Sequence, residues 1–382
     1  MSNTERYKGI IDSVWRINNS SLFEATYGLT EIKPSSIDLK RKQTVRYFLG
    51  ELDPDEKLFV KYFDGSQINA RNEIFNTSRL TQSPELDFVV PILDWEFSGS
   101  KTAIVYPFVQ STTLHEKFIE EDSQTNHPQN LSLVIRVTEQ IRMLQKNGQS
   151  LKTLESHSKI NEPFSEEYFG FDKLFEKVNR AYQSLAKVRD QIIRLYSGLL
   201  LDRTPRNILV NTDNSGLSHI DFENLIFYTP LFDFVKLVRN GPAVPVEDQR
   251  KITDVILHPN NYFWQHNSLN FQEEKDALSS FIDNIMPQKT QVDQNIIYHQ
   301  YLHLCLHNHL FYTNRYLHRI LSPNSPNERI GAEYRFNYHL AGVLSIEDLI
   351  KESFKETGSL PEVGSFYKLM KQLAYKFSDI IK

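Results

Sequence analysis

Short apolar runs bounded by turn-forming residues mark the first 110 residues of the chain. Runs rich in β-branched and aromatic residues predict β-strands, and the Asp, Pro and Gly residues between them predict tight turns. The gap between the third and fourth runs, residues 67–80, predicts a helix with Ser66 as its N-cap, and a short helix is predicted around residues 7–15. The predicted strands are residues 37–41, 44–49, 57–63, 89–97 and 101–108.

Beyond residue 110 the spacing of apolar residues is mostly helical. Thr113 and Glu116 form a capping box that predicts the start of a helix. Apolar side chains recur at helical spacing over residues 131–146 and 171–195, which predicts two long amphipathic helices. Another helix is expected to begin after Asp233, and further helical runs with Pro or Gly stops follow it.

One stretch of this second part has the pattern of a β-hairpin. Residues 208–210 and 217–220 are apolar and partly β-branched, and residues 211–216 between them are turn formers that include Gly216. Antiparallel pairing would bring Asn207, which enters the first strand, and Asp221, which leaves the second, to the same end of the hairpin. Asp202 lies on the loop that leads into that end.

These three side chains have a chemistry in common. The amide of Asn207 and the carboxylate of Asp221 suit a hard divalent cation such as Mg²⁺, which takes other ligands from water and phosphate. Asp202 could orient or deprotonate a hydroxyl that attacks a phosphoryl group. Asp-x-x-Pro-x-Asn is also an ordinary cap-and-turn pattern, so the spacing alone is a weak signal. The joint order of loop, strand, turn, strand and Asp favours a site.

The same residues resemble the protein-kinase-like superfamily. Asp202-x-x-Pro205-x-Asn207-Ile-Leu-Val followed by His219-Ile-Asp-Phe-Glu223, and then by Pro230-Leu-Phe-Asp233, is similar to the aminoglycoside phosphotransferase and choline kinase branch. The resemblance implies an α+β, two-lobed fold, with an antiparallel-sheet nucleotide-binding lobe over residues 1–110 and a mostly helical lobe over residues 111–382. It also implies that Asp202 is the catalytic-loop aspartate, that Asn207 and Asp221 are metal ligands, and that Asp233 braces the loop.

Lys61 stands alone as a cation inside an apolar strand, Leu58-Phe-Val-Lys-Tyr-Phe63. A buried lysine needs an anionic partner, and the resemblance implies that Lys61 contacts the α- and β-phosphates of ATP. The alternative is an edge-strand lysine that prevents aggregation. Glu73 is the only acidic residue of the predicted helix and is the candidate partner of Lys61; otherwise it is a solvated helix carboxylate. Glu85 is a weaker candidate.

The segment from Tyr106 to Gln110 connects the last predicted strand to the helical part. In the superfamily this connection is the hinge, whose backbone groups hold adenine. The resemblance therefore implies that Tyr106 and Phe108 lie at the nucleotide, and the first lobe is expected to end near Gln110.

The sequence departs from the family pattern at three places. Leu200-Leu201 stand where the branch carries His-Gly before the catalytic Asp, and Thr204 stands where protein kinases carry a Lys. Arg203 or Arg206 could supply that charge. The expected phosphate-covering turn holds Lys40-Arg41-Lys42 without glycine, and these cations either neutralise nucleotide phosphates or form a solvated hairpin tip.

Composition limits the classes of protein to which the chain can belong. The formal charge of −5 shows no basic excess for nucleic-acid binding, and a 40% hydrophobic content supports a substantial core over 382 residues. A single cysteine, Cys305, excludes an intrachain disulfide. The N-terminus lacks a signal-peptide pattern and no apolar stretch is long enough to span a membrane. We therefore expect a soluble, cytoplasmic protein with no nucleic-acid or membrane partner.

Histidines at 299, 303 and 307 recur every four residues within a helical run. Such spacing can bind zinc or nickel, but a third histidine eight residues along one helix lies too far along the axis for a tetrahedral site. We interpret the stripe as an aromatic, partly buried helix face and assign no metal to it.

The function implied by the resemblance is an ATP- and Mg²⁺-dependent phosphotransferase that moves the γ-phosphate to a hydroxyl of a small molecule. The aromatic content of 12% and the acidic balance would tolerate a cationic acceptor, without selecting amines over sugars or nucleosides. A protein kinase would need an activation segment, and the short span between Asp221 and Asp233 leaves no room for one. The alternative is a catalytically silent kinase-like module that binds nucleotide or a partner, which the departures before Asp202 motivate.

Overall fold

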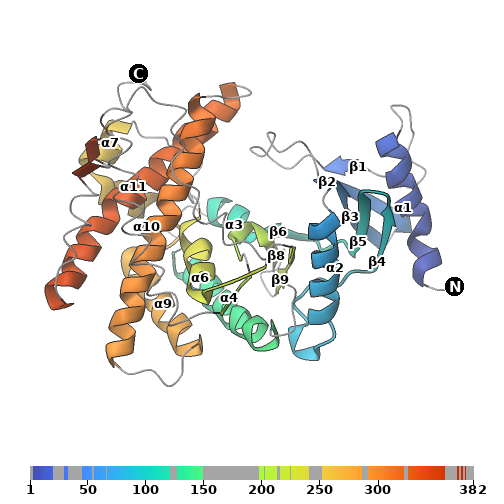
Figure 1. The fold of residues 1–382 in the computed structure, drawn as a ribbon, viewed down its shortest axis with the longest axis horizontal. Helices are drawn as coiled ribbons and strands as arrows, with labels where there is room; N and C mark the ends of the chain where they lie inside the picture. Colours follow the sequence, from blue (N-terminus) through green and yellow to red (C-terminus); the bar gives the residue numbers. More distant parts are fainter. Residues whose placement is uncertain are drawn as a thin grey trace. The chain divides into compact units, whose positions relative to one another are not determined.

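A five-stranded antiparallel sheet occupies the N-terminal part of the structure, a computed structural model (Figure 1). Its strands run in the order β1-β2-β3-β5-β4. The structure describes residues 3–19, 30–32, 45–53, 56–65, 67–120, 127–148, 198–201, 203–212, 216–223, 225–240, 252–285, 291–321 and 326–357, and five residues between 368 and 375. The strands are β1 (Thr30–Ile32), β2 (Val45–Asp53), β3 (Glu56–Asp64), β4 (Asp94–Ser98) and β5 (Lys101–Pro107).

The sheet confirms most of the predicted strands, with one correction. Residues 89–93 were predicted as the start of a strand, but β4 begins only at Asp94. Pro91 lies in this segment, and a proline has no N–H to donate to a strand partner. Val89 instead makes an isolated parallel bridge to His219. The predicted strand 37–41, the cations Lys40 to Lys42 and the cap Ser66 lie outside the described residues.

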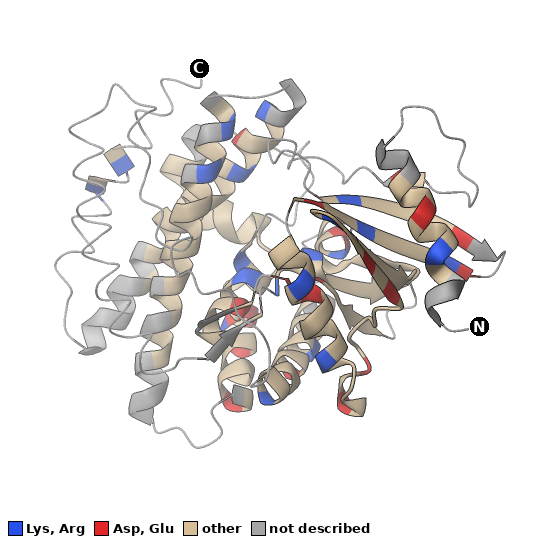
Figure 2. Ribbon diagram, turned by 45° about the vertical axis from the view of Figure 1, so that its right-hand side comes forward, with Lys and Arg blue, Asp and Glu red and all other residues tan. Residues whose placement is uncertain are grey.

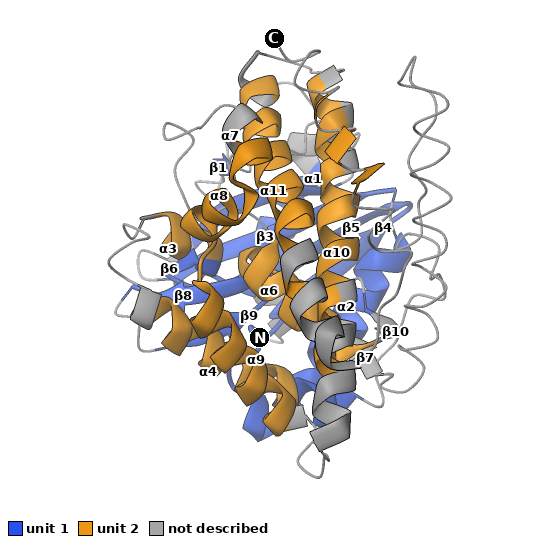
Figure 3. Ribbon diagram, turned by 90° about the vertical axis from the view of Figure 1, so that its left-hand side faces the viewer, with its two compact units in different colours: residues 1–114, 143–154, 207–225 blue, residues 115–142, 155–206, 226–382 orange. Residues whose placement is uncertain are grey.

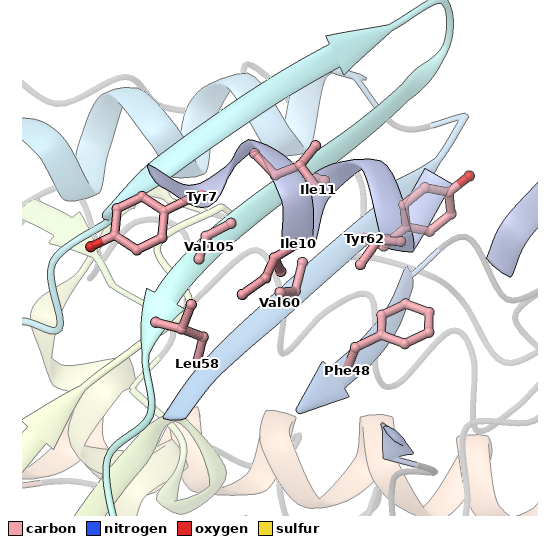
Figure 4. Packing of buried hydrophobic residues seen from close by; sticks show 10 residues of the cluster. Tyr7, Ile10, Ile11, Phe48, Leu58, Val60, Tyr62 and Val105 are labelled. Carbon is pink, nitrogen blue, oxygen red and sulfur yellow. The ribbon is translucent and has the colours of Figure 1, made fainter. Parts of the chain in front are cut away.

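A helix covers each face of this sheet. Side chains at alternate positions of β3 point to opposite faces, and Leu58, Val60 and Tyr62 pack with α1 (Asn3–Asn19), as Figure 4 shows. The opposite face, which carries Phe63, packs against α2 (Gln67–Leu80), a helix with the bounds that the sequence predicted. Lys61 occupies a position on that second face, so the sheet presents its buried lysine to α2.

A second, three-stranded sheet holds the predicted hairpin. Its order is β6-β8-β9, with β6 (Ser111–Thr113), β8 (Ile208–Asn211) and β9 (Leu217–His219). Ile208 pairs with His219, and the Ile220 N–H donates to the Asn207 carbonyl at 3.1 Å. The predicted hairpin is confirmed, and Asn207 and Asp221 therefore lie at the same end of it.

The chain forms two compact units, drawn in different colours in Figure 3. Unit 1 comprises Met1–Leu114, Met143–Leu154 and Asn207–Leu225, and therefore contains both sheets described above. Unit 2 comprises His115–Arg142, Glu155–Arg206 and Ile226–Lys382. The division expected at residue 110 stays a prediction.

Unit 2 is mostly helical, as predicted. Strand β7 (Gly198–Leu200) pairs with β10 (Ile226–Tyr228). The long helices α10 and α11 pack along each other, α10 also packs on α6, and α11 on α8. The described helices with residues in unit 2 are α3 (Leu114–Glu120), α4 (His127–Asn147), α6 (Pro230–Arg239), α7 (Ile252–Leu257), α8 (Pro259–His266), α9 (Phe271–Ile285), α10 (Gln291–Leu321) and α11 (Pro326–Thr357). Two short 3₁₀ turns span Pro84–Leu86 and Pro205–Asn207.

Helix α6 corrects a second prediction. It begins at Pro230 rather than after Asp233, because the Thr229 hydroxyl accepts a hydrogen bond from the Leu231 N–H and Pro230 occupies the first helical position. Asp233 therefore lies in the first turn. Helix α4 confirms the helix predicted over 131–146, and the helix predicted over 171–195 lies outside the described residues.

The histidine-bearing helix is α10. His307 is buried with its ring 6.1 Å from that of Phe232, and His309 is buried 5.3 Å from the ring of Phe263. The structure thus supports the aromatic, buried face that we expected, while the side chains of His299 and His303 lie outside the described residues. Among the residues that the structure describes, no helix combines the length and apolar character that crossing a lipid bilayer requires.

Candidate functional site

Lys61 lies at the centre of a buried ionic cluster in unit 1. Its Nζ is 2.6 Å from Glu73 Oε2, 3.0 Å from Asp221 Oδ1 and 3.2 Å from Glu223 Oε2. The side chains of Lys61, Glu73 and Glu223 are buried, whereas that of Asp221 is 30% exposed. A lysine ammonium has three N–H donors, and three carboxylates accept from it here. When all three carboxylates are ionised, they and the one ammonium give the cluster an excess of negative charge.

The contact between Lys61 and Glu73 follows from the faces of two elements. Lys61 points from β3 to the side covered by α2, and Glu73 is on the buried face of that helix. The predicted pairing is therefore present, and the readings of Glu73 as a solvated carboxylate and of Lys61 as an exposed edge residue are wrong. Glu85 is exposed and lies 3.9 Å from Lys146 instead.

Tyr106 belongs to this cluster in a way that the sequence did not indicate. Its ring is buried on β5, and its hydroxyl donates a short hydrogen bond to Glu73 Oε1. Glu73 is thus held by Lys61 on one oxygen and by Tyr106 on the other. The side chain of Tyr106 fixes the partner of Lys61, and its nucleotide contact stays a prediction.

Phe108 lies just beyond β5 with its side chain 38% exposed. Its backbone N–H donates to the carbonyl of Lys57 at 3.0 Å, which extends the pairing of β5 with β3. That N–H is therefore engaged by the sheet. The predicted adenine contact of Phe108 stays a prediction.

The loop after β9 delivers two of the three carboxylates. Asp221 has φ of +68°, in the left-handed region that Asp tolerates better than most residues. Asn76, buried on α2, donates to the carbonyl of Phe222 at 3.0 Å. Helix α2 thus contacts the loop in two ways: the Asn76 side chain donates to the loop backbone, and Glu73 of α2 shares Lys61 with the carboxylates of the loop. The sequence pattern contained Glu223, but nothing in it identified the contact with Lys61.

Burial and charge shift the protonation equilibria of the cluster. Burial raises the pKa of Glu73 to about 7, against the opposing effect of Lys61. Burial alone would lower the pKa of Lys61, but Asp221, Glu73 and Glu223 together raise it well above its ordinary value. Lys61 therefore stays charged at neutral pH. Burial also raises the pKa of Tyr47, which is paired across the sheet with Lys61, to about 12.

The donor set is suited to a hard cation. Carboxylate oxygens of Glu73, Asp221 and Glu223 all lie within 4.8 Å of one another, and Asp221 is the most exposed of the three. Oxygen ligands and an excess of negative charge are what Mg²⁺ requires. Asn207 lies at the same end of the hairpin through the register of β8 and β9. The residues present therefore fit the cation that the resemblance implies.

In unit 2, Asp233 braces the loop that carries Asp202. Its two carboxylate oxygens accept hydrogen bonds from the backbone N–H groups of Leu201, at 2.8 Å, and Arg203, at 2.9 Å. Burial raises the pKa of Asp233 to about 6, while these two hydrogen bonds favour its charged form. The predicted structural role of Asp233 is confirmed. The side chain of Asp202 lies outside the described residues, so its role stays a prediction.

The two arginines that could replace the missing lysine differ sharply. Arg203 is fully buried and its Nε donates to the carbonyl of Leu201 at 2.8 Å, so it is committed to the loop itself. Arg206 is exposed on the following 3₁₀ turn. Of these two arginines, Arg206 is therefore the one whose side chain reaches solvent.

Comparison with known proteins gives a likeness in structure alone. No family model matches the chain, and no curated protein matches its sequence. An ethanolamine kinase from Plasmodium vivax is similar, with 12% identity and a TM-score of 0.50 over 86% of this chain and 84% of that chain. A thermostable mutant of aminoglycoside phosphotransferase APH(4)-Ia, in a complex with AMP-PNP and hygromycin B, has 14% identity and a TM-score of 0.40, covering 86% and 98% of the two chains.

A streptomycin–ATP complex of APH(2")-IIa is also matched, with 10% identity and a TM-score of 0.43 over 86% of this chain and 97% of that chain. The likeness to the ethanolamine kinase supports the assignment of the fold, because its TM-score is the highest of these three. The chain therefore has the two-lobed, protein-kinase-like fold that the sequence predicted, as the likeness to the ethanolamine kinase shows.

Proposed function

We propose that this protein is an ATP-dependent phosphotransferase that moves the γ-phosphate to a hydroxyl of a small molecule. The observation that carries the proposal is the buried contact of Lys61 with Glu73, next to a more exposed Asp221 on the loop after β9. Structural cores rarely bury one lysine among three carboxylates, because each buried charge loses its hydration. Such a cluster is typical of a site that awaits a charged ligand.

Lys61 would hold the α- and β-phosphates of the nucleotide. All three of its N–H donors are used by carboxylates, so a phosphate oxygen can bind only if one carboxylate gives up its hydrogen bond. Glu73 is anchored by Tyr106, and Glu223 is nearly buried. Asp221 is the most exposed, and we expect it to be the one that turns away.

Asn207 and Asp221 would hold Mg²⁺, with Glu223 beside them. When bound, this cation would neutralise charge on the phosphates. Asp202 would orient the acceptor hydroxyl for in-line attack and accept its proton, and Asp233 would keep the loop of Asp202 in place through Leu201 and Arg203. The likeness in fold to an ethanolamine kinase supports a small-molecule acceptor.

The decisive test is nucleotide consumption with a panel of small hydroxyl compounds, using wild type, Asp202→Ala and Asp221→Ala. We expect Asp202→Ala to lose turnover by about a hundredfold or more while it still binds nucleotide, and Asp221→Ala to lose affinity for Mg·ATP. Wild-type turnover in Asp202→Ala would refute the role of Asp202.

The alternative is a catalytically silent module that binds nucleotide. Leu201, which stands where the family carries glycine before the aspartate, is buried, and this departure favours the alternative. Binding of Mg·ATP without turnover of any acceptor would establish the silent module, and failure to bind Mg·ATP would contradict both functions.

A further inference from the structure

A surface groove of unit 1 lies between helix α2 and strand β4, the last strand of the five-stranded sheet. Its volume is about 560 Å³, and its lining includes Phe75 of α2 and Trp95 and Phe97 of β4. These three aromatic side chains are 38%, 43% and 39% exposed, respectively. The groove is therefore open, and a large part of its aromatic lining faces solvent.

The strand register explains why the two rings of β4 lie beside α2. Trp95 pairs with Ile104 of β5, and Ile104 belongs to the same core cluster as Ile74 of α2. Residues paired directly across two strands lie on the same face of a sheet, as do residues two apart along one strand. Trp95 and Phe97 are therefore on the side of the sheet that α2 covers, and Glu96 between them points to the opposite side.

The charged side chains that line the groove are both arginines. Arg71 and Arg79 of α2 are among the lining residues, and no aspartate or glutamate is. Figure 2 colours the two basic positions of α2 blue and its one acidic position red. That acidic residue, Glu73, is on the buried face of the helix and is bound to Lys61. The exposed face of α2 therefore offers the groove positive charge and no carboxylate.

Arg71 is the cation of the groove that is placed to bind an anion. Its side chain is exposed, and its guanidinium carbon lies 5.4 Å from the centre of the Phe97 ring. Among the residues that the structure describes, Arg71 forms no ion pair with a carboxylate. Contact with a ring does not use the N–H donors of a guanidinium group, so Arg71 can donate paired hydrogen bonds to a carboxylate.

These features favour a segment of another protein over a small ligand. Small-molecule sites are concave and enclose most of the surface of their ligand, whereas the three aromatic side chains here stay more than a third exposed. Aromatic residues and arginine are enriched at protein–protein interfaces, and tryptophan and arginine contribute much of the binding energy there. A cation beside the exposed rings selects a partner of complementary charge.

We propose that the groove between α2 and β4 docks a segment of a partner protein in which acidic residues flank an aromatic or aliphatic anchor. The anchor packs on Phe75, Trp95 and Phe97, and a carboxylate of the segment accepts hydrogen bonds from Arg71. This docking is independent of phosphotransfer, because Lys61 and Glu73 are not among the residues that line the groove.

Defined peptide libraries test the proposal with the full chain. In the acidic library, short peptides carry Phe, Trp or Leu anchors between Asp and Glu residues. In the basic library Lys replaces Asp and Glu, and in a third library Ser replaces the anchors. Binding is measured by fluorescence polarisation. We expect wild type to bind members of the acidic library at least about tenfold more tightly than their counterparts in the other two.

Substitutions in the groove should change this selectivity. Arg71→Glu reverses one charge, so acidic peptides should bind at least about tenfold more weakly and their basic counterparts more tightly than they bind wild type. Trp95→Ser removes an apolar contact and should weaken binding of the acidic peptides. The controls are Arg329→Glu, at an exposed position of α11, and Phe271→Ser, at a ring of α9 that is 37% exposed. Both should bind the acidic peptides as wild type does.

The proposal is overturned if wild type binds no library, if it binds acidic and basic peptides equally, or if Arg71→Glu and Trp95→Ser leave binding unchanged. A dimer of wild type in sedimentation that Trp95→Ser abolishes would assign the groove to a second copy of the chain, and would overturn it too. Thermal unfolding of each variant shows whether it is folded. If Trp95→Ser is unfolded, Arg71→Glu, at an exposed helix position, decides both questions with the same expected directions.

Discussion

Each of the two units contains a buried cation with carboxylate partners, and the two clusters differ in their balance. In unit 1, Lys61 faces three carboxylates, one of which is partly exposed. In unit 2, Arg239 is fully buried, and among the residues that the structure describes it pairs with one carboxylate, that of Glu274, which accepts from its Nε at 2.8 Å and its Nη2 at 2.6 Å.

Aromatic side chains surround Arg239. Its guanidinium carbon lies 4.9 Å from the ring of Phe263 and 5.2 Å from that of Trp264, and Tyr301 donates its hydroxyl to Glu274. One cation and one carboxylate balance in charge, and aromatic rings cover them. The Arg239 cluster is therefore structural, whereas the excess of carboxylates around Lys61 favours a further cation, and that cation would in turn attract a phosphate. A buried charge alone does not identify a functional site. An excess of one charge, together with a partly exposed member such as Asp221, does.

The largest loss of stability should come from breaking the ion pair of Arg239 and Glu274. Arg239→Met leaves Glu274 buried without its cation, and we expect a loss of about 3–5 kcal/mol in the free energy of unfolding. Urea denaturation followed by circular dichroism measures it. Arg329→Met removes an exposed arginine paired with Glu333 and should change stability by less than about 1 kcal/mol. Equal effects of the two substitutions would show that the Arg239 cluster is not structural.

The Lys61 cluster should make the free energy of unfolding depend on pH. The pKa of Glu73 is raised from 4.5 to about 7 in the folded protein. The folded state then binds more protons than the unfolded state between these values, so this group stabilises most below pH 4.5 and its contribution is lost as pH rises through 7. A rise of the pKa from 4.5 to about 7 corresponds to a contribution of about 3 kcal/mol to the free energy of unfolding.

Glu73→Gln removes this titration. We expect the stability of wild type relative to Glu73→Gln to fall as the pH rises from 5 to 8, measured by urea denaturation at each pH. Glu85→Gln, an exposed carboxylate, is the matched control and should follow the pH dependence of wild type. A difference between wild type and Glu73→Gln that is independent of pH would mean that Glu73 is ionised throughout.

The sequence could predict the contacts that depend on local periodicity, but not those between distant segments. The hairpin register and the contact of Lys61 with Glu73 follow from local periodicity, because alternation fixes which face of β3 carries Lys61 and helical spacing fixes the buried face of α2. The contacts of Glu223 with Lys61 and of Asn76 with Phe222 join segments about 150 residues apart. No local pattern encodes such contacts, since they depend on how the hairpin packs beside α2.

The errors have equally specific causes. The run over residues 89–97 is largely apolar, but Pro91 removes a donor that a strand needs. The helix expected after Asp233 begins at Pro230 instead, because Thr229 caps it and Pro230 occupies its first position.

The smallest effect should come from Tyr106, which supports Glu73 without carrying charge. Tyr106→Phe removes the hydroxyl that donates to Glu73 and leaves the ring in the core, so we expect a loss of about 1 kcal/mol in stability. If Glu73 holds Lys61 for nucleotide binding, the same change should also raise the KM for Mg·ATP, because Glu73 becomes free to turn away. Tyr62→Phe, on the opposite face of the sheet, is the control and should leave that KM unchanged. A normal KM in Tyr106→Phe would mean that the Lys61 contact alone is sufficient to hold Glu73.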